Sequence, residues 1–148
     1  MPNYIIYTDG GARGNPGPAG AGVFITDGEG KVLREVAKPL GKQTNNFAEY
    51  SAVLVGFEEM KKVVPKAKRK GVHLEFRMDS ELIQRQLSNR YQIKEESLFP
   101  LYIKVHNFLV SEFPNAKFTH VRREKNLDAD RLSNIAMDLP TGKAGEAQ

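Results

Sequence analysis

The fold is decided by residues 4–11, which read YIIYTDGG, an apolar run that stops at an acid and two glycines. Such a run is typical of a buried strand. Residues 10–22 then carry six glycines and two prolines, which predict a long turn before a second strand near 21–26. Asp27-Gly28-Glu29-Gly30 predicts a hairpin, and the alternation over 31–38 predicts a third strand. The opening of the chain therefore predicts three antiparallel strands.

The rest of the chain changes period. Residues 47–64 are apolar almost all round their first turns and follow Asn46, a good N-cap, which predicts a helix buried against the sheet. The remaining elements are predicted as a strand at 72–78, a helix at 80–89, a helix capped by Ser97 with Pro100 in its first turn, a strand at 116–121 and a helix at 126–139. The order βββαβααβα predicts an α/β domain with a five-stranded mixed sheet over residues 1–139. We expect residues 140–148 to form a flexible C-terminal tail.

Composition bounds the class of protein. The chain has 148 residues, which suits one domain, and its 40% hydrophobic content allows a packed core. The lack of cysteine excludes disulfides, thiolate metal sites and cysteine nucleophiles. A net charge of +4 favours a polyanionic partner only mildly, and an ordinary solvated surface explains it equally well. There is no apolar run of membrane-spanning length and no signal pattern, so we expect a soluble cytoplasmic protein without membrane contact.

Four carboxylates attract attention, although each has an ordinary explanation. Asp9 precedes a glycine as turn residues often do, and Glu49 follows Asn46 at the spacing of a capping box. Asp79 could meet the dipole of the helix that follows it, and Asp130 could lie on a solvated helix face. Taken singly, these explanations are better than a functional one.

Taken together, the acids predict a metal site. Asp9 and Asp79 both end apolar strands, and Glu49 begins a helix too apolar to have an open face. Ligand sites of α/β sheets gather at such strand ends. Three acids at one sheet edge would raise one another's pKa unless a cation offsets them, and an all-oxygen ligand set selects Mg²⁺ or Mn²⁺. Two such ions about 4 Å apart form a phosphodiester-cleaving site.

Four motifs in register resemble those of type 1 ribonuclease H, from Tyr4 to about Asp138. They are YTDGG at 7–11 with GNPGP at 14–18, TNNFAE at 44–49, DS at 79–80, and an asparagine four residues before an aspartate at 126 and 130. The resemblance implies the ribonuclease H-like fold. It also implies an endonuclease that cuts the RNA strand of RNA–DNA hybrids and leaves 5′-phosphate and 3′-hydroxyl ends.

The resemblance further implies the roles of individual residues. The catalytic residues and metal ligands would be Asp9, Glu49, Asp79 and Asp130, holding two Mg²⁺ ions for which Mn²⁺ could substitute, with Asp9 bridging both ions. Asp128 competes for the fourth place. Two helical residues differ by about 200°, so only one of the pair can face the ions. Asp130 shares a polar stripe with Asn126 and Asn134, which favours it, and the family motif agrees.

Substrate contacts are also implied by the resemblance. The residues concerned are Gly10, Asn15, Asn45 and Glu81 for the RNA strand, Thr44 for a phosphate of the DNA strand, and Asn126. Recognition of the 2′-hydroxyl is what separates RNA from DNA. Asn15-Pro16-Gly17 is also an ordinary turn, and Thr44 an ordinary helix-entry residue.

The chain departs from the family pattern in two places. The loop that carries a histidine in many members here reads RREK at 122–125, and His120 lies in a predicted strand, where a structural role is the better interpretation. We hypothesise that Arg123 or Glu124 partly replaces the histidine. The basic, tryptophan-containing insertion of longer members is also missing, which predicts weaker and more salt-sensitive binding. The basic run at 61–70 is better explained as a solvated helix end.

Two other functions compete with the hybrid ribonuclease. One is a nucleic-acid-binding relative that has lost catalysis, against which the four acids argue. The other is a nuclease or transposase of different specificity on the same fold, against which the short chain and the matching asparagines argue. We expect an RNA–DNA hybrid as the partner, no obligate protein partner, and a monomer.

Overall fold

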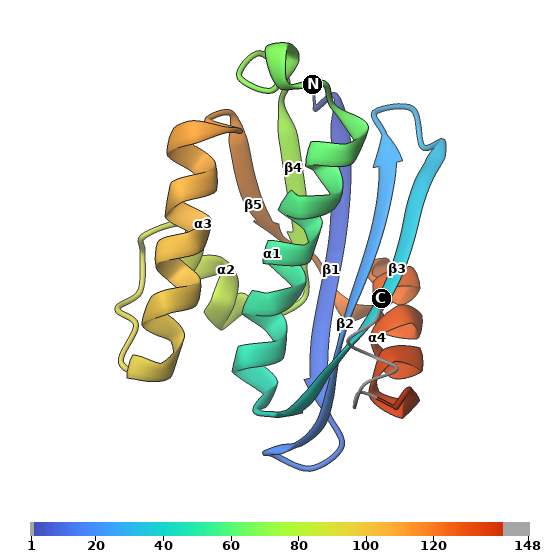
Figure 1. The fold of residues 1–148 in the computed structure, drawn as a ribbon, viewed down its shortest axis with the longest axis vertical. Coiled ribbons are helices and arrows are strands. Elements are labelled where there is room, and N and C mark those ends of the chain that lie inside the picture. Colours follow the sequence, from blue (N-terminus) through green and yellow to red (C-terminus); the bar gives the residue numbers. More distant parts are fainter. Residues whose placement is uncertain (1, 141–148) are drawn as a thin grey trace.

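The sheet has five strands in the order β3-β2-β1-β4-β5, in a computed structural model that describes residues 2–140 (Figure 1). Strands β1 (Tyr4–Ala12), β2 (Gly17–Asp27) and β3 (Val32–Gln43) form an antiparallel meander. Strands β4 (Leu74–Met78) and β5 (Ala116–His120) continue the sheet parallel to β1. The mixed sheet and the predicted order of elements are confirmed.

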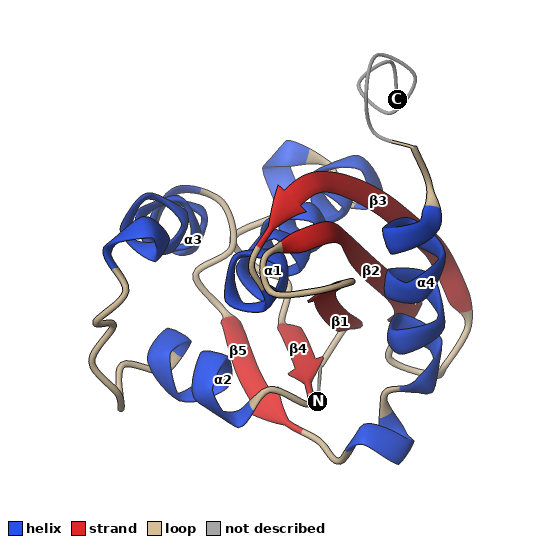
Figure 2. Cartoon of the chain, turned by 90° about the horizontal axis from the view of Figure 1, so that it is seen from below, coloured by secondary structure: helices blue, strands red, loops and turns tan. Residues whose placement is uncertain are grey.

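Helices cover both faces of the sheet. Helix α1 (Asn45–Val63) packs on β1 and β2 from one side, and α4 (Leu127–Asp138) packs on β1, β2 and β3 from the other, so that the strands lie between them in Figure 2. Helix α2 (Glu81–Leu87) lies against β5, and α3 (Phe99–Ser111) against α1. The described residues also form three short 3₁₀ turns: η1 (Lys66–Lys68), η2 (Glu96–Leu98) and η3 (Arg123–Lys125). Within residues 2–140, every helix is too short or too polar to span a membrane.

The main core lies between α1 and the sheet. Phe57 of α1 is fully buried, and its ring lies 4.5 Å from that of Phe76 in β4 and 4.9 Å from that of Phe108 in α3, centroid to centroid. Ile6 and Val53 are also fully buried in this cluster. The buried first turns of α1 explain why the sequence pattern there is apolar on all sides. This core fixes α1, and with it Glu49, against β1.

The glycine-rich segment is mainly strand, so the predicted long turn is wrong. Strand β1 continues through Ala12 and β2 begins at Gly17, which leaves only residues 13–16 as the turn. A Cβ at Gly10 would collide with the backbone of Ala48 in α1, and one at Gly22 with the backbone of α4 at Ala129. Glycine is therefore required here because two helices approach the strands closely, one on each face.

Two predicted helix starts are also wrong. Thr44, not Asn46, caps α1, since its Oγ accepts a hydrogen bond from the Phe47 backbone N–H at 3.2 Å. Glu49 consequently lies beyond the capping-box position and is free for another role. Ser97 does not cap α3, which begins at Phe99 after η2, although Pro100 does lie in its first turn. Of the predicted tail, 140–148, all but Pro140 lies outside the described residues.

Candidate active site

Three carboxylates from three elements meet at one end of the sheet. Asp9 lies in β1, Glu49 near the start of α1, and Asp79 directly after β4. One oxygen from each lies within 4.8 Å of the other two. Strands β1 and β4 run parallel with Tyr7 opposite Arg77, which brings Asp9 and Asp79 side by side two residues later. Figure 2 looks onto this end of the sheet, between α2 and α4.

Glu49 reaches the cluster because Gly10 lets α1 lie on β1. The missing side chain at Gly10 leaves room for the backbone of Ala48 and Glu49. A hydrogen bond from the Gly10 backbone also lowers the pKa of the Glu49 carboxyl, but burial outweighs it and raises that pKa well above its usual range. The charges of Asp9 and Asp79 raise it further. The local backbone thus places a buried acid next to two others.

The pKa of Asp9 shows that ionisation of the clustered acids is unfavourable. Burial raises the pKa of Asp9 to about 7, opposed by the Ser133 hydroxyl, and the charges of Asp79 and Asp130 raise it further. Ser133 donates to Asp9 Oδ2 at 2.6 Å and is fully buried. The pKa of Asp79 is also raised by burial, against the opposing effects of Arg123 and Asn126. Like charges held this closely attract a cation.

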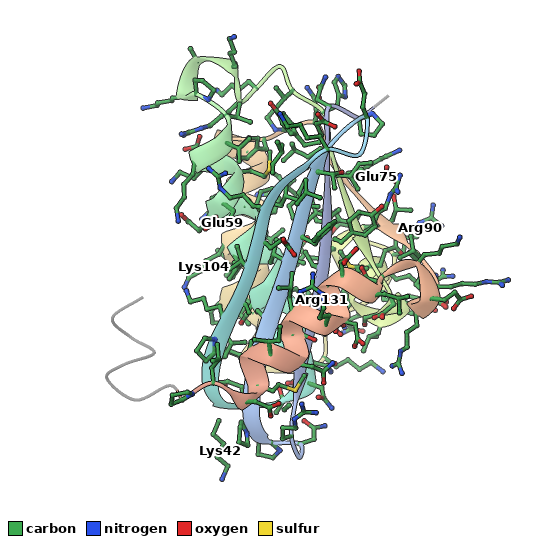
Figure 3. All side chains as sticks on the ribbon, turned by 90° about the vertical axis from the view of Figure 1, so that its right-hand side faces the viewer. Lys42, Glu59, Glu75, Arg90, Lys104 and Arg131 are labelled. Atoms are coloured by element: carbon green, nitrogen blue, oxygen red, sulfur yellow. The ribbon has the colours of Figure 1, made fainter. Side chains whose placement is uncertain are left out.

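Asp130, not Asp128, faces this cluster from α4. Asp130 is half-buried, and its charge raises the pKa of both Asp9 and Asp79. Asp128 is exposed and lies 3.4 Å from Arg131, whose guanidinium also pairs with Glu35 at 2.7 Å. Figure 3 looks onto α4 and labels Arg131 there. Burial and charge therefore favour Asp130 over Asp128, although the tight three-acid group does not include Asp130.

The predicted substrate residues at the start of α1 form one linked unit. The Asn45 backbone N–H donates to Asn15 Oδ1 at 3.0 Å, and Asn45 Oδ1 accepts from the Ala12 backbone N–H at 2.9 Å. These bonds tie the β1–β2 turn to α1, and both asparagines are exposed. Thr44 acts as the helix cap, which is the ordinary explanation of that residue. Asn45 lies one turn before Glu49, on the same face of the helix.

The other two predicted substrate residues differ in their surroundings. Glu81 is exposed in the first turn of α2 and pairs with Arg85 at 2.9 Å. Asn126 is 1% exposed, and its Nδ2 donates to the Thr8 carbonyl at 2.9 Å. A hydrogen bond from Asn126 also lowers the pKa of Asp79. The burial of Asn126 argues against direct substrate contact, and its bonds indicate that it orients Asp79 instead.

Sequence reasoning missed Ser133 and underestimated Arg123. Ser133 follows Asp130 by three residues, so helical spacing alone could have placed it on the same face. Arg123 in η3 is exposed, and its charge lowers the pKa of both Glu49 and Asp79. His120 is exposed at the end of β5, so the expected structural role gains no support from packing. Arg123 is thus a positive charge close enough to act on Glu49 and Asp79. It lies in the loop of residues 122–125, where many family members carry a histidine.

Asp9 lies inside β1, which runs on to Ala12, so the prediction that it ends its strand is wrong, whereas Asp79 does follow β4 directly. The strand order, together with these acids of β1 and β4, defines the ribonuclease H-like fold. Residues 7–136 match the family described as reverse transcriptase-like. The chain belongs to this family and, within it, to the type 1 ribonucleases H.

Individual relatives agree with this assignment. LC11-RNase H1, isolated from compost by a metagenomic approach, is 46% identical with a TM-score of 0.87 over 93% of this chain and 97% of that one. It has also been crystallised in complex with an RNA/DNA hybrid. Ribonuclease HI of Halobacterium salinarum is 34% identical over 89% of this chain and 63% of its own length.

Some relatives are much longer. The bifunctional protein Rv2228c of Mycobacterium tuberculosis is 38% identical over 95% of this chain, which spans only 37% of that protein's length.

Proposed function

We propose that the protein is an endonuclease that hydrolyses the RNA strand of RNA–DNA hybrids and leaves 5′-phosphate and 3′-hydroxyl ends. The observation that carries this proposal is the meeting of Asp9, Glu49 and Asp79 within 4.8 Å at the end of the sheet. The hybrid complex of LC11-RNase H1, which shares 46% of its sequence with this chain, supports the choice of substrate. A relative without catalysis would have no need to keep one buried and two half-buried acids together.

The carboxylates fit divalent ions. Carboxylate oxygens are the ligands that Mg²⁺ prefers, and the raised pKa values of Asp9, Glu49 and Asp79 indicate negative charge that lacks compensation. We assign Asp9, Glu49, Asp79 and Asp130 as ligands of two Mg²⁺ ions, with Mn²⁺ as a substitute. Asp9 is the bridging candidate because it interacts with all three other acids. Bound ions would supply an activated water and neutralise charge on the leaving oxygen.

The chain's own residues orient these ligands. Ser133 holds Asp9 by a hydrogen bond, and Asn126 holds Asp79 while tied to the Thr8 carbonyl. We propose that Arg123, or Glu124 beside it, partly replaces the histidine of other family members. A fixed positive charge at η3 would stabilise negative charge that develops on the substrate phosphate.

Substrate would lie across the residues around the acids, of which Asn15, Asn45 and Glu81 are exposed and Gly10 is buried in β1. We assign Asn15, Asn45, Glu81 and the Gly10 backbone to the RNA strand, and Thr44 to a DNA phosphate. The shared face of Asn45 and Glu49 supports a contact near the cut bond. We further propose that residues 1–139 are the catalytic domain, followed by a short tail. The protein would act as a monomer in the cytoplasm, without an obligate protein partner.

The proposal is tested by incubating labelled RNA–DNA, RNA–RNA and DNA–DNA duplexes with Mg²⁺. The hybrid alone should be cut, Asp9→Asn should abolish cutting, and Asp128→Asn should leave it intact as the matched control. Raising the salt should weaken hybrid binding strongly, because phosphate contacts release counterions. Equal cleavage of all three duplexes would contradict hybrid specificity. Full activity and an unchanged pH profile in Arg123→Ala/Glu124→Ala would remove the role given to that loop.

A further inference from the structure

A buried hydrogen bond joins α1 to α2 one residue away from Glu49. The Tyr50 hydroxyl donates to Gln86 Oε1 at 2.8 Å. Tyr50 is fully buried and Gln86 is 6% exposed. The pair is therefore a directional link between two helices, shielded from water.

Core packing alone does not explain a polar pair at this position. Tyr50 belongs to a cluster of apolar side chains that includes Val53, Ile83 and Leu87. Phenylalanine and leucine would fill a similar volume, whereas burying a hydroxyl and a carboxamide carries a desolvation cost that their hydrogen bond mainly offsets. What a buried polar pair adds is one defined arrangement of the elements it joins.

Both members of the pair are connected to proposed metal ligands. Tyr50 follows Glu49 on the same stiff helix. Helix α2 begins two residues after Asp79 and is capped by Ser80, whose Oγ accepts from the Ile83 backbone N–H at 3.3 Å. With only seven residues, α2 is too short to hold its place without tertiary contacts. Its position, and that of the chain leading from Asp79, depends on such links.

The second link of α2 leads elsewhere. Gln84 Nε2 donates to the Phe118 carbonyl of β5 at 2.8 Å, which holds α2 to the edge of the sheet. Among residues 2–140, the bond that Gln86 accepts from the Tyr50 hydroxyl is the only hydrogen bond between α2 and the helix that carries Glu49. The two glutamines thus locate α2 against two different elements.

We propose that Tyr50 and Gln86 are positioning residues that fix the separation of Glu49 and Asp79 and thereby set the affinity of the site for divalent ions. This inference rests on the proposed function, because it takes both acids as metal ligands. The inference adds two residues that would act on the site through Glu49 and Asp79, without binding ions or substrate themselves.

The test compares Tyr50→Phe, Gln86→Leu and the double variant. Each single variant leaves one buried polar group unpaired and should unfold at a lower temperature. The double variant leaves none unpaired and should recover most of that loss. If the pair positions the ligands, Mn²⁺ affinity of the double variant, measured by calorimetry without substrate, should still fall by about tenfold. Its kcat should fall at limiting Mn²⁺, while KM for the hybrid changes by less than about twofold.

Ser51→Ala provides a matched control on the same helix. The buried Ser51 hydroxyl donates to the Phe47 carbonyl at 2.8 Å, so this variant loses a hydrogen bond that does not reach α2. It should unfold at a lower temperature and bind Mn²⁺ as the unmodified protein does. Unchanged Mn²⁺ affinity in the double variant, or an equal loss in Ser51→Ala, would overturn the positioning role. An unmodified protein that neither binds Mn²⁺ nor cuts hybrid would contradict the proposed function instead.

Discussion

The two ends of α1 differ in how their charged side chains are compensated. At its start, Glu49 lies against Asp9 and Asp79, and burial raises the pKa of each of these three carboxyls. Neighbouring acids raise these pKa values further, and Asp130 is one of them for both Asp9 and Asp79. At its end, Arg69 donates to the Lys61 and Val64 carbonyls at 3.0 and 3.1 Å and pairs with Glu112 at 3.0 Å. That hydrogen bond from Arg69 lowers the pKa of Glu112.

The difference separates function from stability along one helix. The far end follows the usual rule, since a cation satisfies the last carbonyls of the helix and an acid satisfies the cation. The near end breaks it, because neighbouring acids repel and their burial opposes ionisation. Acids held close together at a cost in stability are typical of functional sites.

Glu49→Gln should break the comparison most strongly. Removing one of the clustered acids should lower hybrid cleavage by more than about 100-fold, because even residues that only orient metal ligands affect activity by 10–100-fold. The same change should raise the melting temperature of the metal-free protein, since it relieves repulsion with Asp9 and Asp79. Cleavage assays and thermal unfolding in a chelator measure both effects. A Glu49→Gln variant that is active and less stable would contradict the view that the acids at the start of α1 serve function at the expense of stability.

The pH dependence of stability should be next in size. In the metal-free protein, the pKa of Asp9 is raised to about 7, so between about pH 4 and pH 7 the folded state keeps a proton that the unfolded state has lost. Stability therefore falls as pH rises through this range, and the raised pKa of Glu49 acts in the same direction. The stabilisation gained from saturating Mg²⁺ should grow over the same range, because the ligands bind as carboxylates.

Thermal unfolding at fixed ionic strength, with Mg²⁺ or a chelator, checks this sign. Asp9→Asn is the control, because it removes the group with the raised pKa and should flatten the chelator curve. If the melting temperature of the unmodified protein in a chelator instead rises steadily from pH 4 to pH 7, the pKa values of these acids are not raised and the prediction is wrong.

Much of the fold and site could be predicted because it depends on local pattern. Alternating and apolar runs indicate strands, and an apolar helix indicates burial, so the element order is confirmed. Asp9 and Asp79 converge because β1 and β4 pair in parallel with Tyr7 opposite Arg77, although Asp9 lies inside its strand and only Asp79 lies past the end of one. The predicted meeting of Asp9 and Asp79 therefore depends on the parallel pairing of these two strands.

What could not be predicted depends on contacts between distant segments. Residues 10–22 predict a turn by composition, but Gly10 and Gly22 are there because α1 and α4 pack on their strands. Thr44 and Asn46 are comparable N-caps, and the bonds of Asn45 to the β1–β2 turn accompany a start at Thr44. Helical spacing places Ser133 on the face of Asp130, but its hydrogen bond to Asp9 joins residues 124 positions apart, so the partner could not be predicted from the local pattern.

Arg69→Ala should produce the smallest effect and sharpen the comparison from the far end. It removes the two hydrogen bonds that satisfy the last carbonyls of α1, which should cost about 1–2 kcal/mol of unfolding free energy. Hybrid cleavage per folded molecule should not change, because no proposed ligand or orienting residue contacts Arg69. Lys68→Ala is the matched control, since Lys68 is an exposed cation of the same turn and should change stability by less than about 0.5 kcal/mol. Denaturant unfolding and cleavage rates at 25 °C measure the two effects. A loss of cleavage in Arg69→Ala would mean that the ends of α1 are coupled and that the separation of function from stability along it does not hold.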